Sequence, residues 1–230
     1  MTDWKTFYKQ HDKHDGGQIS EPEEWQVQLA ELLMRSNPTT ALEAGSGYGL
    51  TSLLLGEMVK KTLLDLELSP LITARTIFSR QQDNGKYIAG DLLNMPFPDN
   101  SFDVVFNSGV LEHFSFSQRK QALQEMLRVC KSGSSIIAAI PNHFSIPYRY
   151  AYLYKQKLGR WPYPDEFKLY DFSEELHNIA SAGKQERITL SVSTALGFLR
   201  RHQRILFKIR GVFQKYEGYL TVIAIQKKVG

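Results

Sequence analysis

Apolar and polar positions along the chain follow two different periods. Short apolar runs rich in β-branched residues indicate strands, whereas apolar residues at every third or fourth position indicate helices. Strands are predicted near residues 40–44, 62–68, 86–91, 102–107, 134–140, 186–192 and 219–227. Helices are predicted near residues 22–35, 50–61, 70–82, 117–131 and 173–182. Strand and helix therefore alternate, which predicts an α/β fold built on a mostly parallel, seven-stranded sheet with helices on both faces.

One segment interrupts this alternation with a dense run of aromatic residues. Between Asn142 and Asp171 lie Tyr148, Tyr150, Tyr152, Tyr154, Trp161, Tyr163 and Tyr170, interleaved with lysines and arginines. Because the segment follows a strand at the carboxyl edge of the sheet, where open α/β sheets bind ligands, we expect it to form a small cap over that site. Its rings and phenol hydroxyls would then face a substrate. The alternative is that these aromatics pack a small subdomain or a dimer contact.

A second segment, residues 196–216, combines an apolar stripe with many basic residues. The apolar residues recur at helical spacing: Leu199, Ile205, Leu206, Ile209, Val212, Phe213 and Tyr216. The basic residues fall mainly elsewhere, which predicts a basic amphipathic helix. Residues 142–230 hold 15 Lys and Arg against 7 Asp and Glu, whereas residues 1–141 hold 13 against 17. A basic half favours an anionic partner, such as a phosphate-bearing substrate, nucleic acid or a membrane surface; the alternative is an ordinary solvated helix face.

Length and composition fit one domain. We expect an N-terminal helical extension at residues 1–37, a core at 38–142, the cap at 143–172 and the basic helical insert at 193–217. The single cysteine, Cys130, excludes an intrachain disulfide, and its place on the apolar face of a predicted helix indicates burial. No run approaches the ~20 apolar residues that span a bilayer, and the N-terminus lacks the apolar region of a signal peptide, so we expect a cytoplasmic protein.

A glycine-rich turn follows the first predicted strand. Residues 40–49 read TALEAGSGYG, with Glu43 two residues before Gly45 and further glycines at Gly47 and Gly49. Glycines let the backbone leave a strand tightly and approach a ligand closely, and the N-terminus of the next helix faces the same cleft. The pattern predicts a nucleoside-bearing cofactor; the alternative is a glycine-rich turn without a ligand.

The residues around the glycines indicate which nucleoside-bearing cofactor fits the turn. A dinucleotide fingerprint, G-x-G-x-x-G, would have a third glycine where this chain has Leu50. The carboxylate of Glu43 would repel a pyrophosphate but suits a ligand that carries an ammonium and a sulfonium. These features favour S-adenosylmethionine.

Two later strands also end near acids. The second predicted strand ends with Glu67, directly before the helix-start signal Ser69-Pro70, and Glu67 is placed to accept hydrogen bonds from two ribose hydroxyls. Asp65 shares its face but lies one pleat further from the ligand edge, so Glu67 is our choice. The third predicted strand ends at Asp91, which is placed to accept a hydrogen bond from an adenine amino group.

Together with residues 93–114 and 127–142, these motifs resemble the class I S-adenosylmethionine-dependent methyltransferases of the small-molecule, ubiquinone-biosynthesis-like type. The resemblance covers residues 38–142 continuously. It implies a Rossmann-like fold whose last strand runs antiparallel to the rest, and S-adenosyl-L-methionine as the cofactor. The chain departs from the family where Glu43 and Glu67 replace the commoner aspartates and where Ser132 replaces a proline before a glycine.

The resemblance also implies which residues contact the cofactor. Glu43, Gly45 and Gly47 would surround the methionine moiety, and Glu67 would hold the ribose. Asp91 with Leu92 would frame the adenine. Asn107, just past the fourth predicted strand, would face the methionine end.

Catalysis of methyl transfer depends mainly on holding the acceptor in line with the sulfonium, and a general base helps only if the acceptor must lose a proton. His113, after the fourth predicted strand, is the first candidate for that base, and His143, after the fifth, is the second. The alternative is that His113 only caps a turn. The other histidines show no metal-ligand spacing with nearby carboxylates, so we expect no metal.

The acceptor is predicted to be a small molecule, aromatic or lipophilic in character. The fourth strand is followed by Asn107-Ser108-Gly109-Val110, which is not the (Asp/Asn)-Pro-Pro-aromatic loop of enzymes that methylate DNA amines, and a Pro-Cys nucleophile is missing. An RNA-directed methyltransferase that uses the basic half stays open, as does a non-catalytic cofactor-binding homologue. A homo-oligomer also stays open.

Overall fold

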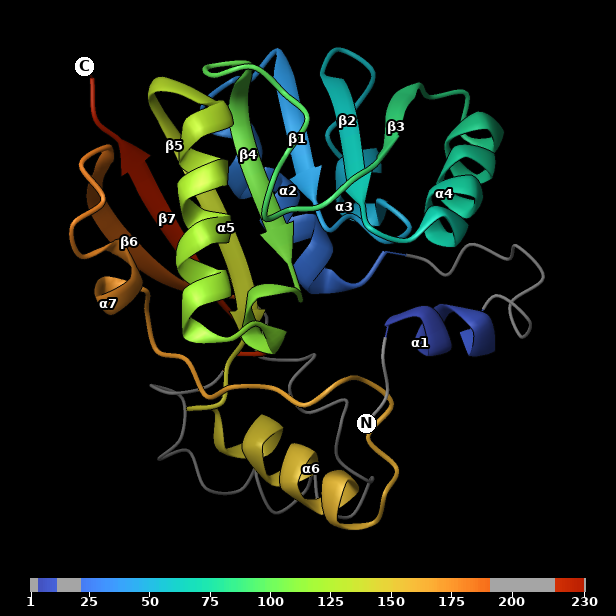
Figure 1. The fold of residues 1–230 in the computed structure, drawn as a ribbon. Coiled ribbons are helices and arrows are strands. Elements are labelled where there is room, and N and C mark those ends of the chain that lie inside the picture. Colours follow the sequence, from blue (N-terminus) through green and yellow to red (C-terminus); the bar gives the residue numbers. More distant parts are fainter. Residues whose placement is uncertain (1–3, 12–21, 191–217, 230) are drawn as a thin grey trace.

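The computed structural model describes residues 4–11, 22–190 and 218–229, and one seven-stranded sheet forms its centre (Figure 1). The strands are β1 (Thr40–Ala44), β2 (Lys60–Asp65), β3 (Gly85–Ala89), β4 (Phe102–Ser108), β5 (Cys130–Pro141), β6 (Ala182–Leu190) and β7 (Leu220–Lys227). Their spatial order is β3-β2-β1-β4-β5-β7-β6. Strands β1 to β5 are mutually parallel, and β7 is antiparallel to its neighbours β5 and β6. The predicted Rossmann-like fold with an antiparallel last strand is confirmed.

Helices cover both faces of the sheet and its carboxyl edge (Figure 1). They are α1 (Trp4–His11), α2 (Glu24–Met34), α3 (Leu50–Leu53), α4 (Leu68–Arg80), α5 (Phe116–Val129), α6 (Ile146–Lys157) and α7 (Ser173–Leu176). Successive side chains of a strand point to opposite faces. Leu42 and Val105 therefore pack under α5, while Ala41 and Val104 pack with α2 on the other face.

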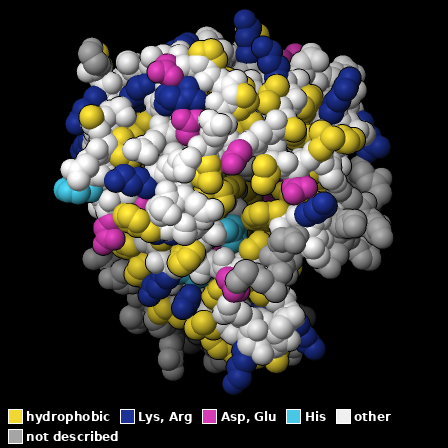
Figure 2. All heavy atoms as spheres, in the orientation of Figure 1, with side chains coloured by type: hydrophobic (Ala, Val, Ile, Leu, Met, Phe, Trp, Pro, Cys, Tyr) yellow, Lys and Arg dark blue, Asp and Glu magenta, His cyan; other side chains and the backbone are white. Residues whose placement is uncertain are grey.

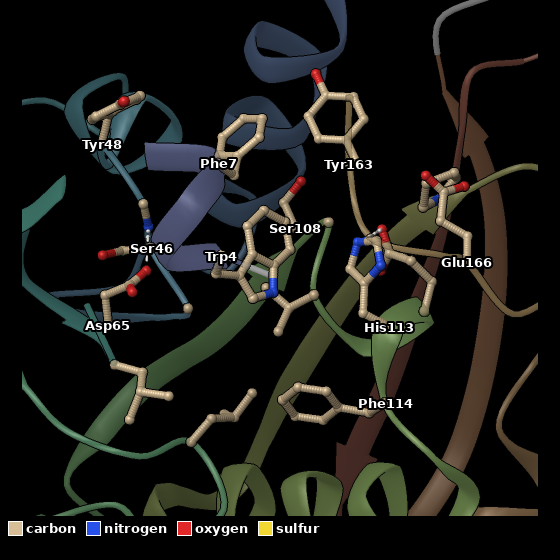
Figure 3. Close-up of a pocket in the computed structure, with 18 of the residues that line it drawn as sticks. Trp4, Phe7, Ser46, Tyr48, Asp65, Ser108, His113, Phe114, Tyr163 and Glu166 are labelled. Carbon is tan, nitrogen blue, oxygen red and sulfur yellow. Dashed lines mark hydrogen bonds and ion pairs between the residues drawn. The ribbon is translucent and has the colours of Figure 1, made fainter. Parts of the chain in front are cut away.

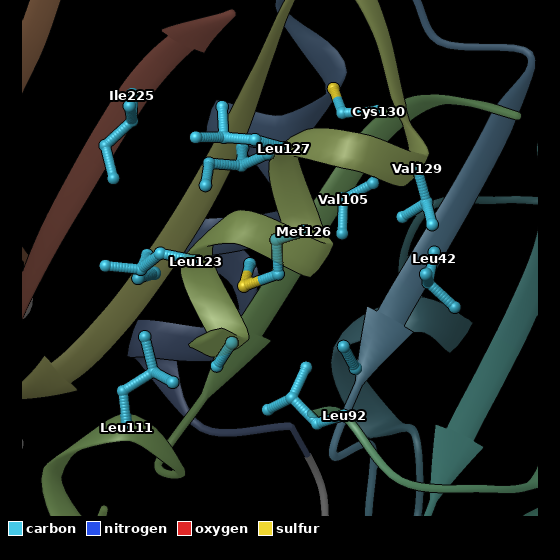
Figure 4. Close-up of a cluster of buried hydrophobic side chains, with 14 of the residues drawn as sticks. Leu42, Leu92, Val105, Leu111, Leu123, Met126, Leu127, Val129, Cys130 and Ile225 are labelled. Carbon is cyan, nitrogen blue, oxygen red and sulfur yellow. The ribbon is translucent and has the colours of Figure 1, made fainter. Parts of the chain in front are cut away.

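Helix α5 shows how local sequence builds this core. It begins at a capping box, in which the Ser115 hydroxyl and the Gln118 side chain satisfy each other's backbone amides. Leu123, Met126 and Leu127 follow at helical spacing and are fully buried against the sheet (Figure 4). Each such side chain contributes ~2 kcal/mol by leaving water. Cys130 is buried at the end of the helix, as predicted, and burial raises the pKa of its thiol to about 11.

Several predicted boundaries were wrong, each for a local reason. The helix expected over 50–61 ends at Leu53, since the chain turns at Gly56, where φ is 77°, and enters β2 at Lys60. The helix expected over 173–182 is a single turn that ends at Leu176, since the chain turns at Asn178, where φ is 66°, before β6 begins at Ala182. Helix α6 was not predicted, and α1 lies within the predicted N-terminal helical extension although no helix was assigned to its residues.

The ends of two strands bear on the site. Strand β2 ends at Asp65 instead of near residue 68, and Glu67 is the N-cap of α4 in place of Ser69. Strand β3 ends at Ala89, two residues before Asp91. The predicted basic helix at 193–217 lies outside the described residues. Within the described ranges, no helix is long and apolar enough to cross a membrane.

Candidate active site

A cavity of about 390 Å³ lies at the carboxyl edge of the sheet (Figure 2). Its floor is formed by the loops after β1, β2, β3 and β4, and its walls by α1, by residues of the 143–172 segment and by Tyr219 and Leu220. Strands β1 and β4 are neighbours although β2 and β3 lie between them in sequence. The sheet order reverses at this point, which is where open α/β sheets bind ligands.

The glycine loop after β1 forms one end of the cavity. Gly45 and Gly47 adopt φ of 75° and 52°, a left-handed conformation that favours glycine. A Cβ on Gly45 would lie 2.7 Å from a Val110 methyl of the loop after β4. The amides of Gly45 and Ser46 both donate to the carbonyl of Leu64 in β2, at 2.7 and 2.9 Å. Backbone geometry thus holds the loop close to two neighbouring strands.

The two acids at the end of β2, Asp65 and Glu67, have different surroundings. The Asp65 carboxylate accepts the amides of Gly47 at 2.8 Å and of Glu67 at 2.9 Å, so it ties the glycine loop to α4 (Figure 3). Burial raises the pKa of Asp65. Glu67 also lines the cavity, and its carboxylate has no hydrogen-bond partner among the described residues. Since both oxygens of Asp65 are engaged by the backbone, Glu67 remains the acid available to a ligand.

Glu43 does not line the cavity. Its side chain is buried on the α3 side of the sheet, where it accepts the Ser52 hydroxyl at 2.6 Å and the Ser52 amide at 3.2 Å. Burial raises its pKa to about 7. The residue therefore braces the start of α3 behind the glycine loop, instead of reaching the ligand side as we had expected.

Two other predicted contacts lie beside the cavity. Asp91 is exposed, and its carboxylate accepts the amide of Leu93 at 2.8 Å, while Leu92 is buried and lines the cavity. Asn107 lies inside β4, fully buried on the α5 side, where its amide donates to the sulfur of Met126 at 3.5 Å. Because side chains alternate along a strand, the next residue, Ser108, lines the cavity in its place.

His113 lines the cavity opposite the glycine loop (Figure 3). It ends the single 3-10 turn η1 (Leu111–His113), and its Nδ1 lies 3.0 Å from the carbonyl oxygen of Asp165. A carbonyl can only accept, so Nδ1 carries the proton and Nε2 is the basic nitrogen. Burial lowers the pKa of His113, which keeps the ring neutral near pH 7. The ring meets Trp4 of α1 edge-to-face at 5.0 Å.

His143 is buried outside the cavity lining. Its Nδ1 lies 3.1 Å from the Arg149 guanidinium, which can only donate. Nε2 therefore carries the proton, and it lies 2.9 Å from the carboxylate of Glu166, which does line the cavity. His143 has no free lone pair for an acceptor, so the geometry favours a role in orienting Glu166 over our expectation of a base.

Aromatic rings close the cavity on the side away from the sheet. Trp4, Phe7 and Tyr8 come from α1, and Tyr148, Trp161 and Tyr163 come from the predicted cap, which is therefore aromatic-rich as expected. Phe7 meets Tyr163 at 5.3 Å, and Tyr8 meets Tyr48 of the glycine loop at 5.7 Å. The α1 residues were missed, although Trp4, Phe7 and Tyr8 have the i, i+3, i+4 spacing of one helix face.

Two buried glutamates in the cavity wall were also missed. Glu112 precedes His113 in η1, and the amide of Phe167 donates to its backbone carbonyl at 2.7 Å, so Glu112 and Glu166 lie in adjacent segments. Burial, reinforced by the charge of Glu166, raises the pKa of Glu112 well above its ordinary value. The sequence feature that could have identified Glu112 is its position directly before His113. In the described part of the chain, these groups form no cluster suited to a metal ion.

Comparison with known proteins identifies a matching family and several relatives of this chain. Residues 42–138 match the family described as "Methyltransferase domain". A demethylmenaquinone methyltransferase of Thermotoga maritima is 29% identical over 116 residues, which cover 49% of this chain and 48% of that protein. Ajmaline N-methyltransferase of Rauvolfia serpentina is 31% identical over 104 residues, covering 44% and 35%. The chain thus matches less than half the length of either relative.

The whole fold also matches solved structures. A S-adenosylmethionine-dependent methyltransferase of Thermotoga maritima, described as a possible histamine N-methyltransferase, superposes with a TM-score of 0.62 over 89% of this chain and 88% of that one. Sequence identity is 18%, so this likeness speaks for the fold alone.

Proposed function

We propose that this chain, whose residues 42–138 match the methyltransferase domain family, is a class I S-adenosylmethionine-dependent methyltransferase that methylates a small-molecule acceptor bound beneath α1 and the cap. The observation that carries the proposal is one continuous cavity. The glycine loop and Glu67 line one end, while His113 and the aromatic walls line the other. Cofactor and acceptor would therefore meet at the loop after β4.

The cofactor end fits S-adenosylmethionine. Glu67 would accept from the ribose hydroxyls, Leu92 would pack on the adenine with Asp91 at its edge, and the backbone at Gly45 and Gly47 would border the methionine moiety. Two observations support this fit: the Glu67 carboxylate is without a hydrogen-bond partner among the described residues, and a Cβ at Gly45 would intrude on the space between the loops. The bound cofactor would supply a methyl group on a cationic sulfur.

The acceptor end supplies position and a proton acceptor. Rings from α1 and the cap would hold an aromatic or lipophilic acceptor by stacking and would exclude water. His113 is neutral, with Nε2 unprotonated, so it is poised to take a proton if the acceptor nucleophile carries one. Most of the rate would come from holding the acceptor in line with the methyl group.

The two other readings are less well supported. Methylation of RNA would rest on the basic segment at 193–217, which lies outside the described residues. A non-catalytic cofactor-binding homologue would need Glu67, but it would not need a neutral His113 that faces the same cavity. We also keep the prediction of a cytoplasmic protein that acts on a diffusible acceptor.

Calorimetry with S-adenosylhomocysteine tests the proposal. The wild type should bind it, and Glu67→Ala should lose roughly 1–3 kcal/mol, because a charged acceptor of two hydroxyls is removed. Glu31→Ala, an exposed glutamate of α2 distant from the cavity lining, is the matched control and should bind like the wild type. Binding of NADH in preference to S-adenosylhomocysteine would refute the proposed function.

A further inference from the structure

Two acids are buried together at the acceptor end of the cavity. The side chains of Glu112 and Glu166 are 2% and 3% exposed, and both residues line the cavity. Two bonds fix the segments that carry them: the Phe167 amide donates to the Glu112 carbonyl, and His113 Nδ1 donates to the Asp165 carbonyl. One backbone and one side-chain hydrogen bond therefore hold the two acid-bearing segments together.

Neither acid has a cationic partner in the described part of the chain. Oε2 of Glu112 has no hydrogen-bond partner there, and its Oε1 lies 3.7 Å from the unprotonated Nε2 of His113. Glu166 receives the Tyr148 hydroxyl at 2.7 Å and faces Nε2 of His143 at 2.9 Å, both of which are neutral groups. The nearby arginine, Arg149, binds the far side of the His143 ring instead.

Such an arrangement is costly without a ligand. A buried carboxylate without a nearby cation is unfavourable. It either takes up a proton and becomes neutral, or it is stabilised by a bound positive charge. The raised pKa of Glu112 is the expected response of a protein that has not yet bound that charge.

The surrounding rings favour a cation as well. Trp4, Tyr148, Trp161 and Tyr163 also line the cavity, and the Trp161 ring lies 5.6 Å from that of Tyr163 and 6.0 Å from that of Tyr148. Figure 3 shows Tyr163 on the same side of the cavity as His113 and Glu166. Faces of Trp and Tyr attract ammonium groups, and the attraction grows when water is excluded. Carboxylates and aromatic rings on one wall are the chemistry that selects an organic cation over a neutral molecule of equal size.

We propose that the methyl acceptor is an alkylamine that carries an aromatic ring, bound as its ammonium by Glu112 and Glu166 and enclosed by the rings of α1 and the cap. The proposal rests on the proposed methyltransferase function and names the substrate class of that site. The cofactor also carries an ammonium, in its methionine moiety, so the test separates these two cations.

Methyl transfer to the bound ammonium begins with the loss of one proton. The ammonium gives one proton to the unprotonated Nε2 of His113, which becomes an imidazolium 3.7 Å from Oε1 of Glu112, and the amine is left with a free electron pair. That pair forms the new nitrogen–carbon bond, while the sulfur–carbon bond breaks and its electrons stay on sulfur. The products are neutral S-adenosylhomocysteine and the methylated ammonium, which retains the charge that the sulfonium has lost.

The experiment compares charged and neutral ligands of one shape. Wild-type protein saturated with S-adenosylhomocysteine is titrated with 2-phenylethylamine, tryptamine and tyramine, and with the alcohols that replace each amine by a hydroxyl. At least one amine should bind on the order of tenfold to a hundredfold more tightly than its alcohol, which is the value of hydrogen bonds to a charged group. With S-adenosylmethionine present, mass spectrometry should show that this amine gains one methyl group.

Variants assign the preference to the two acids. Glu112→Gln and Glu166→Gln should each remove most of the preference for the amine while leaving the affinity for the alcohol and for S-adenosylhomocysteine unchanged. Glu174→Gln, an exposed acid of α7, is the control and should keep the full preference. Thermal unfolding of each variant checks that the fold is intact.

The other outcomes refute the proposal in distinct ways. Alcohols that bind as tightly as their amines, or no binding by any probe, would overturn the amine assignment while the methyltransferase function stands. A loss of S-adenosylhomocysteine affinity in Glu112→Gln, with no amine preference in the wild type, would assign the acid to the cofactor. Failure of the wild type to bind S-adenosylhomocysteine would overturn the proposed function itself.

Discussion

The two ends of the cavity are built by different means. At the cofactor end, backbone geometry dominates: the left-handed glycines and the Asp65 bonds to two amides come from residues within one strand–turn–helix unit and its neighbour. At the acceptor end, side chains dominate, and they come from α1, η1, the cap and the start of β7. The cofactor end therefore depends on contacts between residues close in sequence, whereas the acceptor end depends on contacts between segments that come together only when the chain folds.

The largest effect should come from filling the glycine loop. Gly45→Ala places a Cβ 2.7 Å from a Val110 methyl and strains a φ of 75°, so S-adenosylhomocysteine affinity should fall on the order of a hundredfold. Gly56→Ala is a matched control, since its φ is 77° but nothing lies within 4 Å of the added Cβ. It should lower stability without affecting binding. Equal losses in both variants would show that strain alone matters.

Removal of the acceptor-end base should leave the cofactor end untouched. His113→Ala should lower kcat on the order of a hundredfold with unchanged affinity for S-adenosylhomocysteine, whereas the exposed His177→Ala should retain full activity. Because burial lowers the pKa of His113, its basic form persists to pH values below the ordinary histidine range. The wild-type rate should therefore fall only as pH drops through that lowered pKa, and this limb should vanish in the variant. Weaker cofactor binding in His113→Ala would place the residue at the wrong end.

Loss of a ring from α1 should act on the acceptor alone. Trp4→Ala removes an edge-to-face contact with His113 and one wall of the cavity, so KM for the acceptor should rise about tenfold with little change in KM for the cofactor. Lys5→Ala, exposed on the same helix, should behave like the wild type. If the KM for the cofactor rose as much as the KM for the acceptor, α1 would belong to both ends.

The smallest effect should come from Asp65→Asn. One carboxylate oxygen is replaced by a donor that faces the amide of either Gly47 or Glu67, so unfolding should become easier by ~1–2 kcal/mol. Affinity for S-adenosylhomocysteine should drop only a few fold, because the acid positions the loop instead of touching the ligand. A drop as large as that of Glu67→Ala would make Asp65 the ribose ligand.

The sheet and the glycine turn were predictable from the sequence to a greater extent than the walls of the acceptor end, for physical reasons. The glycine turn and the succession of strands and helices along the chain depend on backbone conformation and on local periodicity, and both can be recognised in the sequence. Glu43 and Asn107 were assigned to the ligand side by resemblance, yet side-chain alternation in β1 and β4 turns them toward α3 and α5. Because successive side chains of a strand face opposite sides of the sheet, an error of one residue in the assignment moves a side chain to the wrong face.

The acceptor end depends on contacts between segments far apart in sequence. Glu112 meets the 165–167 segment, and Trp4 meets His113, across more than fifty and one hundred positions respectively. Local sequence patterns do not predict contacts between residues so far apart in the chain. His143 was a reasonable choice by its strand end, but the guanidinium of Arg149, which fixes its tautomer, becomes a neighbour only in the folded chain.

The most direct test is a crystal structure of the protein with S-adenosylhomocysteine bound. We expect the ribose to bind to the Glu67 carboxylate, the adenine to lie beside Leu92, and the sulfur to lie at the Ser108–Val110 loop, pointing toward His113 and the aromatic walls. An adenosine bound among the aromatic rings near Trp161, or a ribose without contact to Glu67, would contradict the division of the cavity into a cofactor end and an acceptor end.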